Sequence, residues 1–327
     1  MSYTTENIKN VSIAGHGGTG KTTLFERLLF AGAVISRPET VESGKTVGDY
    51  SPEEIERKIS IHAALGHVER RGKKLNFFDT PGSSDFTGDV ILSFRASEFA
   101  LLLVDGRDGV QIETIKLWRN LENRETPRGV FLNKLDDERG DFNHVLADIK
   151  DKLKREPVPL TIPMGKGAAY KGVIDVLNGK AWLTQGGDAP EKEEPLPDEF
   201  KGAYDAAREK LIEAAAEGDD TLMEKYLDQG SLDPEEIRSG LVKALAENKF
   251  VPAFAGAALK NSGLQALLDF VCDVVPNPLT AKDTALGADN KEIKVPIDPA
   301  KPFSGLIIKT TYDQFSGKLS WVKVITG

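Results

Sequence analysis

Residues 15–22 read GHGGTGKT, and this stretch limits the possible folds more than any other part of the chain. Two glycines four residues apart are followed directly by Lys21 and Thr22, with a strand-like pattern before them and a helix-like pattern after them. Glycines let the backbone approach phosphate oxygens closely, and a helix N-terminus adds positive partial charge. The stretch therefore predicts a phosphate-binding loop between a strand and a helix.

Composition places the chain among proteins with a full hydrophobic core. Its 327 residues, 40% of them hydrophobic, are enough for two domains with extensions. A formal charge of −9 argues against sequence-independent nucleic-acid binding but leaves a specific ribonucleoprotein site open. No leader-like start and no apolar run of about 18 residues is present, so we expect no membrane contact and a cytoplasmic protein. The single Cys272 is expected to be a small buried hydrophobe.

The order of strand-like and helix-like segments predicts an α/β fold with a mainly parallel sheet. Alternation holds over residues 1–156 and resumes over 250–280, which together form the predicted phosphate-binding domain. The composition changes over 157–249, which we interpret as an inserted α+β subdomain. Residues 281–302 are predicted to be a linker, and 303–327 the first hairpin of a β-barrel that is truncated here.

Two further motifs fall at the ends of predicted strands. Asp79 follows an apolar strand, where its carboxylate can bind Mg²⁺, and the Gly82 amide can sense a γ-phosphate. Lys21 is predicted to bridge the β- and γ-phosphates, while the Thr22 hydroxyl binds Mg²⁺. The remaining nucleotide-binding residues of the first loop are His16, Gly17, Gly18, Thr19, Gly20 and Thr23.

The segment Asn133-Lys134-Leu135-Asp136 ends another strand and predicts the base that is bound. Ligands of open α/β sheets bind at the carboxyl ends of the strands. The Asp136 carboxylate can accept two hydrogen bonds from guanine, which adenine cannot return, so the site should select GTP over ATP. Asn133 would brace the loop, and the stem of Lys134 can lie against the base.

With these motifs in place, the chain resembles the translational GTPases of the elongation factor G family. Residues 57–61, RKISI, are similar to the family's RGITI, and 251–278 resemble its guanine loop and closing helix. Residues 158–182 resemble the start of the subdomain that this factor carries, and 302–327 the opening of its second domain. The resemblance covers nearly the whole chain, which would form the amino-terminal portion of such a factor.

The resemblance implies GTP/GDP and Mg²⁺ as cofactors and the ribosome as partner, at the large-subunit factor-binding site and the sarcin-ricin loop. It implies a monomer that couples GTP hydrolysis to elongation or translocation. Ser60 corresponds to the family's threonine ligand of Mg²⁺, and Gly256, Ala257 and Ala258 correspond to its guanine loop.

One departure from the family concerns catalysis. Ser83 stands where the family has the histidine that orients the attacking water, and this side chain is too short for that role. His62 and His67 are the nearest histidines in sequence, but each falls in a strand pattern. We therefore expect a divergent paralogue with weak hydrolysis. The alternatives are a GTP-binding switch with little or no hydrolysis and a ribosomal protection factor of the tetracycline-resistance kind.

Overall fold

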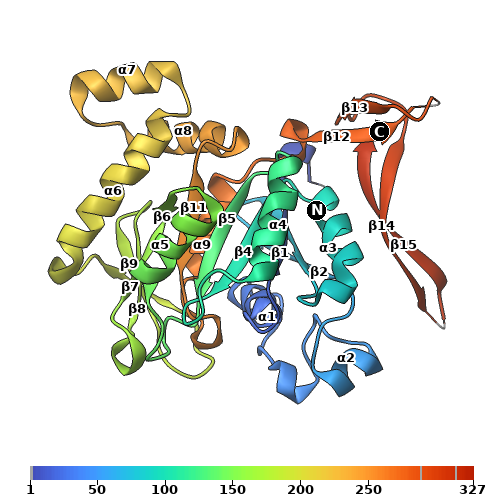
Figure 1. Cartoon of the computed structure of the whole chain (residues 1–327), viewed down its shortest axis with the longest axis horizontal. Helices are drawn as coiled ribbons and strands as arrows, with labels where there is room; N and C mark the ends of the chain where they lie inside the picture. Colours follow the sequence, from blue (N-terminus) through green and yellow to red (C-terminus); the bar gives the residue numbers. More distant parts are fainter. Residues whose placement is uncertain (1–2, 288, 314) are drawn as a thin grey trace.

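A seven-stranded sheet lies at the centre of the protein, in the order β2-β3-β1-β4-β5-β11-β6 (Figure 1). This computed structural model describes residues 3–287, 289–313 and 315–327. All neighbouring strands are parallel except β2, which pairs antiparallel with β3. The predicted α/β fold with a mainly parallel sheet is thereby confirmed. The strands are β1 (Ile8–Gly15), β2 (Ala64–Arg70), β3 (Lys73–Asp79), β4 (Phe99–Asp105), β5 (Arg128–Asn133), β11 (Val251–Ala255) and β6 (Pro157–Pro159).

Helices cover both faces of this sheet, which explains why its central strands are apolar throughout. Along β4, Leu101 and Leu103 face the core shared with α1 and α9, whereas Leu102 and Val104 face the core shared with α3, α4 and α5. Every residue of β4 is buried. The helices are α1 (Lys21–Ala31), α3 (Thr87–Ala96), α4 (Ile112–Asn123), α5 (Phe142–Leu153) and α9 (Leu264–Asp273). In the part of the chain that the structure describes, no helix is long and apolar enough to cross a bilayer.

The segment between β6 and β11 adds a second layer of structure at one end of the sheet (Figure 1). It contains an antiparallel sheet in the order β10-β9-β8-β7, followed by helices of which α6 packs against α8. The strand that leads into this segment, β6, joins the central sheet by pairing with β11. The elements are β7 (Thr161–Met164), β8 (Gly172–Asp175), β9 (Lys180–Leu183), β10 (Lys192–Pro195), α6 (Lys201–Ala216), α7 (Asp220–Gln229) and α8 (Pro234–Ala246).

The carboxyl-terminal part consists of two hairpins at the opposite end of the molecule (Figure 1). Strands β12 (Lys282–Leu286) and β13 (Glu292–Pro296) pair antiparallel in the segment that the sequence predicts as a linker. A Pro-, Asp- and Lys-rich composition does not prevent this, because strand pairing needs only backbone groups. Strands β14 (Ser304–Asp313) and β15 (Gly317–Thr326) form the predicted long hairpin.

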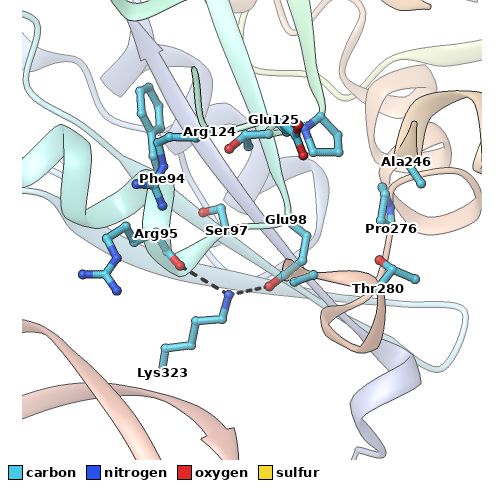
Figure 2. A pocket seen from close by; sticks show the side chains of 13 residues that line it. Phe94, Arg95, Ser97, Glu98, Arg124, Glu125, Ala246, Pro276, Thr280 and Lys323 are labelled. Atoms are coloured by element: carbon cyan, nitrogen blue, oxygen red, sulfur yellow. Dashed lines mark hydrogen bonds and ion pairs between the residues drawn. The ribbon is translucent and has the colours of Figure 1, made fainter. Parts of the chain in front are cut away.

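A buried ion pair attaches the long hairpin to the central sheet (Figure 2). The Lys323 ammonium on β15 donates to Glu98 Oε1 at 2.6 Å and to the Arg95 carbonyl at 3.4 Å. Asn10 on β1 donates to the other carboxylate oxygen of Glu98 at 2.8 Å. The side chains of Lys323 and Glu98 are only 9% and 2% exposed. The hairpin therefore has fixed contacts with Glu98, just before β4, and with the end of α3, and Glu98 in turn is bound by β1.

Candidate nucleotide-binding site

Loops that follow β1 and β3, together with Lys134 just after β5, meet at one edge of the sheet and border a cavity of about 400 Å³. The segment between α1 and β2, which contains α2 (Pro52–Arg57), closes it from another side. The lining residues are Gly17, Gly18, Gly20, Lys21, Thr22, Thr23, Val41, Glu42, Asp49, Lys58, Ile59, Ser60, Gly82, Ser83 and Lys134. Residues from three separately predicted motifs thus share one cavity.

Gly15 and Gly20 of the first loop combine a backbone conformation that other residues rarely adopt with a lack of room for a side chain. Gly15 has φ +149°, and a Cβ there would lie 2.6 Å from the carbonyl oxygen of Leu103 on β4. Gly20 has φ +94°, and a Cβ there would lie 2.4 Å from Asn133 Nδ2. Both positions therefore need glycine, because a side chain would push the loop away from β4 and β5.

Lys21 begins α1 and is almost fully buried under the first loop. Its ammonium donates to the carbonyl of His16 at 3.0 Å, and burial lowers its pKa to about 8. The loop after β3 comes very close to this ammonium group, since a Cβ at Gly82 would lie 2.5 Å from Lys21 Nζ. Lys21 and Gly82, which were predicted to contact the phosphates, therefore lie side by side.

The residues predicted to bind Mg²⁺ come together from three segments. Thr22 Oγ1 and Ser60 Oγ lie 2.9 Å apart. Asp79 is buried at the end of β3, and its Oδ1 has no hydrogen-bond partner among the described residues. Burial raises the pKa of Asp79 to about 7. Two hydroxyls beside a buried carboxylate with an uncompensated oxygen form an oxygen donor set that suits Mg²⁺.

Asp49 is a candidate that the sequence reasoning missed. It lines the cavity and is buried, and neither of its carboxylate oxygens has a hydrogen-bond partner in the described part of the chain. Burial raises the pKa of this carboxyl group. The preceding residue, Gly48, packs closely against Asp79, since a Cβ at Gly48 would lie 2.9 Å from Asp79 Oδ2. Asp49 lies in a loop without periodic pattern, so no strand end marked it in the sequence.

Two buried carboxylates hold the segment that carries Asp49 and Ser60. Glu26 on α1 accepts hydrogen bonds from the amides of Glu39 and Val47 at 3.1 and 2.9 Å. Glu54 on α2 accepts from the amides of Ile61 and His62, both at 3.0 Å, and also takes part in the capping box with Ser51. The segment is thus fixed on either side of Asp49.

The two histidines considered near Ser83 differ in their surroundings. His67 lies in β2, as its pattern predicts. His62 lies in the loop before β2, so the strand prediction for it is wrong; Glu54 holds its backbone amide, and its Nδ1 lies 3.7 Å from Asp89 Oδ2. Ser83 itself lines the cavity, and its hydroxyl accepts from the Asp85 amide at 3.4 Å.

Asn133 connects the three loops predicted to hold the nucleotide. Its Nδ2 donates to the Thr19 carbonyl of the first loop at 2.8 Å. Its Oδ1 accepts from the Ala258 amide at 2.9 Å, in the predicted guanine loop of Gly256, Ala257 and Ala258. Asp136 lies close by, with its Oδ2 3.4 Å from Lys260 Nζ. The residues predicted to bind the base therefore lie beside the first loop.

Asp105 is a second residue that the sequence reasoning missed. It ends β4 and pairs with Lys134, whose Nζ lies 2.8 Å from Asp105 Oδ2 and also donates to the Gly18 carbonyl. Burial disfavours its charge, but hydrogen bonds from Arg107 and Lys134 outweigh burial and hold the pKa at about 2. The signal that marked Asp79, a carboxylate at the end of an apolar strand, also applies to Asp105.

The fold and these loops define a nucleotide-binding α/β domain of the P-loop class. The sequence matches the family described as the elongation factor Tu GTP binding domain over residues 6–277, and the chain belongs to this family. It is 35% identical to elongation factor G of Thermotoga neapolitana and 34% identical to elongation factor G of Mycoplasma pneumoniae, covering 98% of this chain and 47% of either relative.

A crystal structure of a protein from Thermus thermophilus is similar, with a TM-score of 0.84 and 27% identity over 98% of this chain and 46% of that one. The chain therefore spans about half the length of the relatives that it matches. The resemblance predicted from the motifs is confirmed at the level of the family.

Proposed function

We propose that this chain is the guanine-nucleotide-binding part of a translation factor that acts on the ribosome in the manner of elongation factor G. The carrying observation is that Lys21, Gly82 and Lys134, from three motifs far apart in sequence, border one cavity. Family membership supports GTP and GDP as the ligands. The relatives' printed name, elongation factor G, supports a role in translation.

The geometry supports hydrolysis by in-line attack of water on the γ-phosphate. Lys21 and the Gly82 amide would stabilise charge that develops on the phosphate oxygens. Mg²⁺ would be held by Thr22, Ser60 and Asp79 and would neutralise phosphate charge. Asp49, which lines the same cavity, would help to position these ligands and would not itself replace any of them.

Base selection would rest on residues beside Asn133. The Asp136 carboxylate would accept hydrogen bonds from guanine, and Lys134 would lie along the ring with its ammonium held by Asp105. The loop of Gly256, Ala257 and Ala258 would supply backbone amides to the base oxygen.

Ser83 bears on the rate of this reaction. A serine hydroxyl held by the Asp85 amide cannot orient water as a histidine would, so we expect slow hydrolysis unless the ribosome supplies the missing group. A GTP-binding switch with little turnover is the second candidate, and Ser83 is the observation that favours it. In either case we propose a cytoplasmic monomer whose partner is the factor-binding site of the large ribosomal subunit.

The test is GTP binding and single-turnover hydrolysis by the purified protein with Mg²⁺, in the presence and absence of ribosomes. We expect GTP to bind and ribosomes to accelerate cleavage. Lys21→Ala should abolish binding of GTP and GDP, and GTP affinity that survives this change would refute the proposed pocket. Tight binding without any ribosome-stimulated cleavage would favour the switch.

A further inference from the structure

The carboxylate of Glu191 caps a helix that lies far from it in sequence. Glu191 precedes β10, and its Oε1 accepts from the Gly263 amide at 2.7 Å. Its Oε2 accepts from the amides of Leu264 and Gln265 at 3.0 and 2.8 Å. These amides form the start of α9, and Gly263 at the N-cap has no side chain to bind them. The segment between β6 and β11 therefore supplies the cap of α9 from outside.

Two further contacts tie the same segment to the turn before α9, and a third ties it to α1. The Tyr170 hydroxyl lies 2.8 Å from Ser262 Oγ, and both side chains are buried. The Ala189 carbonyl accepts from Asn261 Nδ2 at 3.0 Å. Asp188 pairs at 2.9 Å with Arg27, which lies on α1, the helix that follows the phosphate loop.

This turn continues directly into the predicted guanine loop. Ala257 and Ser262 exchange backbone hydrogen bonds at 3.2 and 3.1 Å, so the position of Ser262 determines that of Ala257. The next amide, Ala258, is bound by Asn133. A loop that is already fixed loses less conformational freedom when a ligand binds, and its affinity is correspondingly higher.

We infer that Glu191 is a positioning residue for guanine recognition: by capping α9 it holds the turn of residues 256–263 in the geometry that reads the base. The inference rests on the proposed function, because it assigns this turn to the base of a bound guanine nucleotide. Tyr170 helps to hold the same turn through its contact with Ser262.

The test compares Glu191→Gln with the native protein by the ratio of the Kd for ADP to the Kd for GDP, measured by competition against fluorescent GDP. Glutamine keeps the volume of the side chain but loses the charge and one acceptor. We expect the ratio to fall roughly fivefold, because the loss of a typical N-cap changes an equilibrium constant by about that factor. A loss of folded protein scales both affinities equally and leaves the ratio unchanged.

Asp175→Asn is the matched control. Asp175 is also buried and lies in the same segment, but it accepts its hydrogen bonds from Asn178. Its ratio should equal that of the native protein. Should Glu191→Gln fail to fold, Tyr170→Phe decides, because it removes only the hydroxyl that contacts Ser262, and we expect its ratio to fall as well.

An unchanged ratio in Glu191→Gln, or in Tyr170→Phe if the first variant is unfolded, would overturn the inference while the native preference for GDP stands. A native protein that does not prefer GDP to ADP would instead refute the proposed function itself, and the positioning role with it.

Discussion

Thr22 and Ser60 bring their hydroxyl oxygens to within 2.9 Å of each other, although 38 residues separate them in sequence. Thr22 is fixed in the first turn of α1, whereas Ser60 lies in the segment between α2 and β2. Glu54 holds that segment by binding the amides of Ile61 and His62. The approach of Ser60 to Thr22, and so to the proposed metal site, therefore depends on the position of α2.

Ser60→Ala should weaken Mg²⁺ binding in the complex with a non-hydrolysable GTP analogue. We expect at least the roughly tenfold loss that removal of an outer partner causes at a metal site, with GDP affinity nearly unchanged. Titration of Mg²⁺ into the analogue-bound protein measures this. Ser43→Ala is the control, because Ser43 lies in the same segment between α1 and β2 but donates its hydroxyl to the Thr40 carbonyl, away from Thr22. Equal Mg²⁺ affinity in both variants would remove Ser60 from the metal site.

Asp136→Asn should change the preferred base from guanine to xanthine. The change replaces an acceptor by a donor, so the side chain would match the extra oxygen of xanthine in place of the amino group of guanine. The measurement is the ratio of the Kd values for GDP and xanthosine diphosphate. Asp137→Asn serves as control, since Asp137 pairs with Arg107 and Arg139. If GDP remained preferred in Asp136→Asn, the base would not lie beside Asp136.

The stability of the nucleotide-free protein should depend on Glu191 in a pH-dependent way. Burial raises the pKa of Glu191 to about 7, above its ordinary value of 4.5, in spite of three backbone hydrogen bonds. A raised pKa in the folded state stabilises the protein below the unfolded-state pKa, and this contribution is lost as the pH rises toward 7.

The melting temperature of the native protein should therefore fall relative to that of Glu191→Gln between about pH 5 and pH 8. Thermal unfolding of both proteins over this range is the measurement, and other titrating groups cancel in the difference. A difference that stays constant with pH would show that Glu191 is charged throughout.

The pair of Lys323 and Glu98 should contribute strongly to the attachment of the long hairpin. Lys323→Met leaves the Glu98 carboxylate buried with the Asn10 amide as its remaining partner among the described residues, and breaking such a pair costs about 3–5 kcal/mol. Urea unfolding measures this loss, with the exposed Lys318→Met as control. The double variant with Glu98→Gln should recover part of the stability. Strictly additive losses would mean that the two side chains do not interact.

The three motifs and the strands of the central sheet other than β6 could be predicted, because each rests on a local pattern; β6 lies in the segment predicted as the inserted subdomain. β4 is a continuous apolar run, and Asp79 and Asn133 each follow a strand that ends at the carboxyl edge of the sheet. Parallel strands bring such ends together whatever the intervening sequence. The order of the strands was therefore enough to predict that these motifs lie together.

The contacts between distant segments could not be predicted in this way. Asp49 lies in a non-periodic loop, and its burial depends on Gly48 packing against Thr22 and Asp79. The cap of α9 by Glu191 and the pairing of β12 with β13 likewise depend on tertiary packing. A single sequence shows none of these contacts, because a side chain that binds a backbone group far away in the chain leaves no periodic pattern around itself.

Ser83→His should raise GTP hydrolysis, and only when ribosomes are present. Ser83 lines the cavity at the start of the segment after Gly82, so a longer side chain there can reach water beside the γ-phosphate. A positioned general base or water-orienting group contributes roughly 10²–10⁴-fold, and we expect a ribosome-dependent gain of at least the lower value. Single-turnover cleavage with and without ribosomes measures it, and Ser84→His, one residue further along, is the control. Acceleration without ribosomes would mean that the histidine acts alone. No acceleration would mean that another group already fills the role left by Ser83, or that the segment from Ser83 to Phe86 holds the side chain away from the phosphate.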